Sequence, residues 1–97
     1  MGKGLTIAGA GAALKRLREE ADLSLADAAT AFGTDKGLVS RYENDKVAAP
    51  ESYLAALAAR LNRSTSSVVL ECLKERYPAL GTSKVGKLLD RIIRQID

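Results

Sequence analysis

Hydrophobic residues recur three and four positions apart along most of the chain, the spacing of helices that bury one face. The pattern begins at about Ala12 and is broken by short polar stretches. The expected helices cover about 12–21, 24–32, 36–43, 50–61, 64–77 and 84–96. No alternating run of strand length, rich in Val, Ile or Tyr, lies between them. We therefore expect an all-α fold.

Turn residues mark the ends of the first helices. Asp22 and Gly33 tolerate a left-handed backbone and are expected to end the first and second helices. Ser24 and Asp27 fit a capping box that opens the second helix, and Asp35 is an expected cap of the third. These residues predict several short helices with defined boundaries.

The chain divides into three parts on this pattern. Residues 1–11 are rich in glycine and are expected to form a flexible tail. Residues 12–80 carry the first five helices and are expected to form one domain. Gly81–Ser83 is expected to be a hinge, so residues 81–97 hold a separate C-terminal helix.

The second and third helices are separated by only a few residues, Gly33–Asp35, which is the sharp turn of a helix-turn-helix unit. At 100° per residue, small or hydrogen-bonding side chains share one arc of the third helix. The opposite arc carries its bulky residues. The first arc holds Lys36, Gly37, Ser40, Arg41 and Asn44, and the second holds Leu38, Val39, Tyr42 and Glu43.

The polar arc has the chemistry to read DNA bases. An arginine such as Arg41 donates a bidentate pair of hydrogen bonds to guanine, and Lys36 reaches a guanine or a phosphate. Ser40 donates or accepts, and Gly37 lets the helix backbone approach the bases closely. A polar face that is merely exposed to solvent would show the same pattern. The tight turn before the helix favours the interpretation that this face binds in the major groove of DNA.

The stretch LKRLREEADLSLADAATAFGTDKGLVSRYENDKVAAPESYLAALAARLN resembles the Cro/repressor-type (Xre-like) helix-turn-helix family of the lambdoid phage repressors. Its most specific parts are SLADAATAFGTDKGLVSRYEN and a later pattern formed by Pro50, Leu54, Leu57–Ala58 and Leu61–Asn62. The resemblance implies a five-helix, lambda-repressor-like domain, to which this chain adds a C-terminal amphipathic helix.

Roles for individual residues follow from the resemblance. It implies base reading by Lys36, Gly37, Ser40 and Arg41. It implies phosphate contacts from Ser24, from the main chain at Leu25, and from Asn44 and Lys46. It also implies a partly buried ion pair between Arg18 and Glu43, for which the alternative is two unrelated surface charges.

Three positions depart from the family pattern. Leu25 stands where relatives often carry a glutamine, which limits this position to main-chain contact with a phosphate. The loop Val47–Ala49 lacks the cations that some relatives place over the minor groove. Ala28 occupies a usual leucine site, and we expect Phe32 to fill the space.

The last helix carries an apolar stripe at i, i+3, i+4, i+7, i+8 and i+11. The stripe consists of Val85, Leu88, Leu89, Ile92, Ile93 and Ile96. It can fold back on the domain, pair with a second subunit or lie on a membrane. We favour pairing, because the five-helix domain already looks complete and the hinge sets the last helix apart. A homodimer is expected, and the short seam also allows a tetramer.

Composition limits the chemistry further. The chain has no histidine and one cysteine, Cys72, which we expect to serve packing rather than redox chemistry. No nucleophile, base or metal-ligand set can be assembled, so we expect neither an enzyme nor a cofactor or metal site. The longest apolar run, Leu54–Ala59, is far shorter than a membrane span. The net charge of +3 is mildly basic and compatible with nucleic acid.

These observations predict a sequence-specific, double-stranded DNA-binding transcription regulator, most simply a dimeric repressor that binds a palindromic operator. A cytoplasmic protein without a small-molecule ligand is expected. The alternative is an antitoxin or co-regulator whose helix-turn-helix scaffold and C-terminal helix bind a partner protein.

Overall fold

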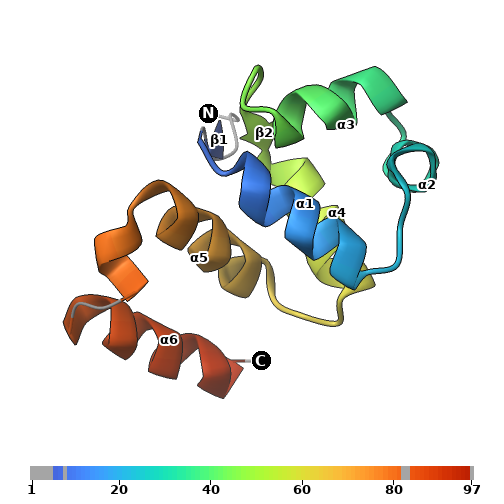
Figure 1. Cartoon of the computed structure of the whole chain (residues 1–97). Coiled ribbons are helices and arrows are strands. Elements are labelled where there is room, and N and C mark those ends of the chain that lie inside the picture. The colour runs from blue at the N-terminus through green and yellow to red at the C-terminus, as the bar shows by residue number, and fades with distance from the viewer. Residues whose placement is uncertain (1–5, 8, 82–83, 97) are drawn as a thin grey trace, which may run out of the picture.

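Helices make up nearly all of the regular structure, in the order that the hydrophobic pattern predicts (Figure 1). The structure is a computed structural model that describes residues 6–7, 9–81 and 84–96. Its helices are α1 (Gly11–Glu20), α2 (Leu25–Ala31), α3 (Lys36–Glu43), α4 (Glu51–Arg60), α5 (Thr65–Arg76) and α6 (Lys84–Ile96), with a 3₁₀ turn η1 (Pro78–Gly81). The expected all-α fold class is confirmed. Within the described residues, no helix combines the length and apolar character that a membrane crossing needs.

Left-handed residues end several helices, as the turn chemistry predicts. Asp22 has φ 59° after α1, and Gly33 has φ 67° after α2. Asp45 (φ 60°) and Asn62 (φ 57°) do the same after α3 and α4. Aspartate, asparagine and glycine adopt this backbone at the least cost. The short side chains therefore allow the chain to reverse direction within a few residues.

The N-terminal segment differs from the flexible tail expected over residues 1–11. Strand β1 (Thr6–Ile7) pairs antiparallel with β2 (Ala49–Pro50), Thr6 opposite Pro50 and Ile7 opposite Ala49. Ala10 is buried, and α1 begins at Gly11. The expectation is wrong for these residues because a two-residue strand leaves no periodic signal; residues 1–5 and 8 lie outside the described part.

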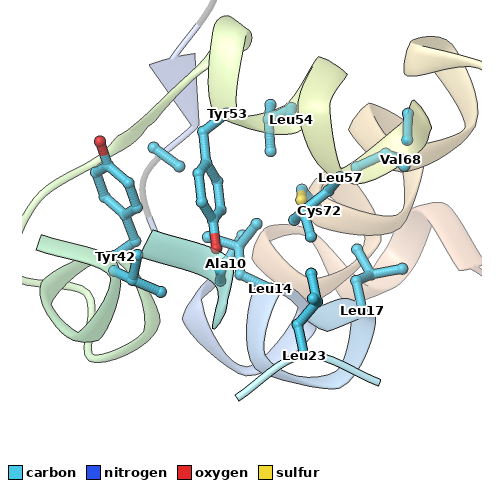
Figure 2. Close-up of a cluster of buried hydrophobic side chains, with 14 of the residues drawn as sticks. Ala10, Leu14, Leu17, Leu23, Tyr42, Tyr53, Leu54, Leu57, Val68 and Cys72 are labelled. Carbon is cyan, nitrogen blue, oxygen red and sulfur yellow. The ribbon is translucent and has the colours of Figure 1, made fainter. Parts of the chain in front are cut away.

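The core lies between α1, α3, α4 and α5, whose apolar side chains converge in Figure 2. Its largest fully buried side chains are Leu14, Leu17, Val39, Leu54, Leu57, Val68 and Cys72. The Phe32 ring meets the Tyr53 ring edge-on, at a centroid distance of 5.2 Å, and Ala28 is fully buried. Burial raises the pKa of the Cys72 thiol to about 11, which agrees with the packing role expected for it.

Helix α6 lies beside α5 and η1, so the chain does fold back, but only through part of the helix surface. Gly86 is packed against the main chain of Leu80, where a Cβ would overlap the Leu80 carbonyl oxygen. Lys74 Nζ on α5 pairs with Asp90 Oδ2 at 2.7 Å. Gly81, the first residue of the expected hinge, belongs to η1, and residues 82–83 are outside the described part.

Much of the apolar stripe on α6 remains uncovered. The exposed fractions are 62% for Val85, 53% for Leu88, 37% for Leu89 and 45% for Ile92. The side chains of Ile93 and Ile96 lie outside the described residues. Figure 1 places α6 at the opposite end of the molecule from α3, so the exposed stripe is remote from the helix-turn-helix unit.

Candidate nucleic-acid interface

Helices α2 and α3 pack against each other across the turn Phe32–Asp35. The Thr34 N–H donates to the Ala29 carbonyl at 2.9 Å, and this hydrogen bond, which spans the left-handed Gly33, ends α2. Asp35 then caps α3, its Oδ1 accepting from the Leu38 N–H at 2.8 Å. The turn is therefore fixed by main-chain and capping hydrogen bonds, and the direction of α3 relative to α2 is set locally.

Helix α3 has one buried and one exposed side, divided as the helical arc predicts. Val39 is fully buried and Tyr42 is 7% exposed. Lys36, Gly37 and Arg41 are exposed on the other side, and Ser40 beside them is half-buried. The four residues named as base readers thus share the outward surface, and their role at DNA is a proposal taken up below.

The ion pair implied for Arg18 and Glu43 is present and fastens α3 to α1. Arg18 Nε donates to Glu43 Oε2 at 2.6 Å, and Nη2 donates to Oε1 at 3.1 Å. Both side chains are less than 10% exposed, at 8% and 6%. The third Arg18 nitrogen, Nη1, donates to the Leu23 carbonyl at 2.7 Å. Hydrogen bonding to Glu43 raises the pKa of Arg18 above its ordinary value.

The turn after α3 is fastened to the start of α1 by Asp45, a contact that sequence reasoning missed. Asp45 Oδ1 accepts from the Gly11 N–H at 2.9 Å. Ala10, the residue before α1, provides no side-chain cap, so Asp45 supplies one from a distant part of the chain. The approach is close: a Cβ at Gly11 would lie 2.2 Å from the Glu43 carbonyl oxygen. A glycine at the helix start was the available signal.

Asn44 caps the end of α3 in the free protein. Its Nδ2 donates to the Ser40 carbonyl at 2.8 Å and to Ser40 Oγ at 3.2 Å. The amide group named for a phosphate contact is therefore engaged within the helix, and it also orients the Ser40 hydroxyl. Lys46, two residues on, is exposed and carries its charge beyond this cap.

The predicted capping box opens α2. Ser24 Oγ accepts from the Asp27 N–H at 3.0 Å, and the Ser24 N–H donates to Asp27 Oδ2 at 3.3 Å. The hydrogen bonds with Ser24 hold the pKa of Asp27 below its ordinary value. Because the carboxylate takes the Ser24 N–H, a phosphate at this end would meet the Ser24 hydroxyl and the main chain at Leu25.

The Asp35 carboxylate, before α3, was interpreted from the sequence only as a cap. It is exposed and lies next to the exposed face of α3. Its position before Lys36 was the signal that could have drawn attention to it. Within the described residues, no group of three or more histidine, cysteine or acidic side chains is placed to hold a metal ion.

A family profile described as a helix-turn-helix domain matches residues 10–68, which is more than half of the chain. No curated protein matches the sequence. Among solved structures, the chain is similar to the clp gene regulator ClgR from Corynebacterium glutamicum, with 22% sequence identity and a TM-score of 0.62. That match covers 84% of this chain and 87% of the regulator's chain, and at this identity it supports the fold.

The profile match begins at the buried Ala10 and includes α1 to α4, the whole helix-turn-helix unit and the start of α5. The resemblance stated from the sequence is therefore confirmed at the level of the family. The family profile and the structural match agree on a helix-turn-helix fold. The chain belongs to the helix-turn-helix domain family.

Proposed function

We propose that this protein is a sequence-specific regulator of transcription that inserts α3 into the major groove of double-stranded DNA. The observation that carries the proposal is the exposure of Lys36, Gly37 and Arg41, with Ser40, on a helix whose other side is held in the core. The major groove is about 12 Å wide and admits a helix. Arg41 would donate to guanine, and Lys36 to guanine or a phosphate.

Contacts to the DNA backbone would surround the base-reading residues. Lys46 supplies an exposed cation one turn beyond α3, and Ser24 and Leu25 supply a hydroxyl and a main-chain amide at the start of α2. Asn44 would join them if its amide exchanges Ser40 for a phosphate oxygen. Such contacts position the protein and make its affinity fall with salt, while base contacts select the sequence.

The C-terminal helix is proposed to pair two copies of the chain through Val85, Leu88, Leu89, Ile92, Ile93 and Ile96. Exposed apolar stripes of this kind mark interaction surfaces. Leu89 also lines an apolar groove of about 400 Å³ with Val69, Leu70 and Leu73 of α5, so the stripe continues onto the domain. A two-fold dimer fits a palindromic operator, and a dimer bound at a promoter would repress transcription by occluding it.

The direct test selects bound sequences from a random duplex pool. We expect an enriched palindrome with half-sites about one helical turn apart, and an affinity that falls steeply with salt. An enriched single half-site would uphold DNA reading and contradict the two-fold dimer. A pool without enrichment would contradict sequence-specific binding.

A second candidate function rests on the same exposed stripe of α6. Nothing in an apolar stripe selects self-pairing over a foreign protein, so an antitoxin or co-regulator would use it for a partner chain. Native mass measurement of the purified chain separates the two. A dimer at micromolar concentration supports self-pairing, and a folded monomer under the same conditions supports a protein partner.

A further inference from the structure

The cap of α3 uses only part of the Asp35 carboxylate. The bond to the Leu38 N–H, at 2.8 Å, is made by Oδ1. A carboxylate has two oxygens and accepts several hydrogen bonds, so Oδ2 keeps its own capacity to accept. Asp35 is exposed, and it precedes Lys36 at the N-terminal end of α3. In a groove-bound helix of this type, the N-terminal residues are those that contact base edges.

Gly37 opens a gap between this acceptor and a donor. A Cβ at Gly37 would lie 3.1 Å from Asp35 Oδ1 and 3.7 Å from Arg41 Nη1. The carboxylate and the guanidinium therefore border the same point on the exposed surface of α3. With hydrogen in place of a side chain at Gly37, a base edge can approach both groups at once.

The base edges of the major groove match this pair of groups. Guanine offers the O6 and N7 acceptors for an arginine, and cytosine offers its N4 amino group as a donor. Thymine and guanine would turn acceptors toward a carboxylate. Adenine has a donor, N6, but the adjacent N7 acceptor would face the second carboxylate oxygen. Cytosine is thus the base that a carboxylate at this position favours.

We propose that Asp35 determines specificity by accepting a hydrogen bond from the N4 amino group of a cytosine. This cytosine belongs to the base pair adjacent to the one whose guanine Arg41 contacts. The inference rests on the proposed function, because it assigns a base to a residue of the same interface. Asp35 also places a negative charge near phosphates, so it weakens binding to every other sequence. The residue thereby improves discrimination while lowering affinity for random DNA.

The test compares Asp35→Ser and Asp35→Asn with the wild-type chain in selection from a random duplex pool. Both replacements are good N-caps, so α3 keeps its start and thermal unfolding should be nearly unchanged. Glu75→Gln is the matched control: it removes one negative charge on α5, where the half-buried Glu75 pairs with the exposed Arg16 at 3.6 Å.

For the wild type, we expect selection of a cytosine in the base pair adjacent to the one whose guanine depends on Arg41. With Asp35→Ser, preference for that cytosine should fall from about tenfold to about twofold, and the guanine should remain. Asp35→Asn should lose the cytosine as well, and it should bind random duplex more tightly than wild type. Glu75→Gln should keep the wild-type sequence preferences.

Two results would overturn the inference in different ways. If Asp35→Ser selects the same sequence as the wild type, Asp35 is a helix cap only, and the proposed function stands. If the wild type enriches no sequence, both the proposed function and this inference are contradicted.

Discussion

The Asp45 carboxylate accepts a hydrogen bond from the Gly11 N–H at 2.9 Å and thereby joins the turn after α3 to the first residue of α1. Helix α3 is consequently held at two places by α1, here and through the pair of Glu43 with Arg18. Since α1 contributes the buried Leu14 and Leu17, these two contacts connect α3 to the core. A helix that reads bases requires this kind of support, because a small displacement would misplace its side chains.

Asp45→Ala should destabilise the fold by about 2 kcal/mol, because it removes an N-cap and also places alanine at a left-handed position (φ 60°) that aspartate adopts more readily. Asp45→Asn keeps an oxygen that can accept from the Gly11 N–H, so it should stay close to the wild type. Urea unfolding followed by circular dichroism measures both. Equal stability of Asp45→Ala and the wild type would mean that the contact contributes nothing to the fold.

Glu43→Gln should be more damaging, costing about 3 kcal/mol, because it leaves the buried Arg18 without its counter-charge. Arg16→Gln is the matched control: Arg16 is 55% exposed and its pairs with Glu71 and Glu75 are 3.5 and 3.6 Å long. Exposed pairs contribute about 0–1 kcal/mol. Urea unfolding should rank the two variants in this order, and equal losses would show that burial of the Arg18 pair does not matter.

Arg41 and Lys46 are expected to separate sequence selection from general affinity. Arg41→Ala should cost about 1–3 kcal/mol at the selected site and relax the preference at one base pair. Lys46→Ala should weaken binding to all duplexes alike and reduce the slope of log affinity against log salt by about one. Titrations with selected and random duplexes at several salt concentrations distinguish these outcomes. Identical behaviour of the two variants would contradict the division of roles.

The local rules of the sequence account for most of this fold. Capping and left-handed turn residues such as Ser24 and Gly33 act over a few positions, so their effects are readable in the chain itself. The outward arc of α3 is likewise fixed by helical periodicity. The Arg18–Glu43 contact spans 25 positions, and it was implied only by resemblance to a family.

Contacts between distant segments were beyond the sequence pattern. The bond from Gly11 to Asp45 spans 34 positions, and the β1–β2 pair joins residues more than 40 positions apart. Neither leaves a periodic signal, because each depends on how the assembled helices bring two loops together. The hydrogen bond of Asn44 to Ser40 is local, four positions apart, and it was missed for another reason: the same amide could equally have pointed away from the helix.

The exposed stripe on α6 leads to the last prediction. Leu88 and Ile92 lie one turn apart and are 53% and 45% exposed, so a charged side chain there should leave the monomer fold intact. Leu88→Glu with Ile92→Glu should convert a dimer to a monomer in sedimentation experiments, because pairing would bury both carboxylates without partners. Lys87→Glu with Arg91→Glu also introduces two glutamates, with a larger change of net charge, but on the exposed polar side of α6, and should retain the dimer. If the first variant keeps the dimer mass, the two chains pair through another surface and α6 is free for a different partner.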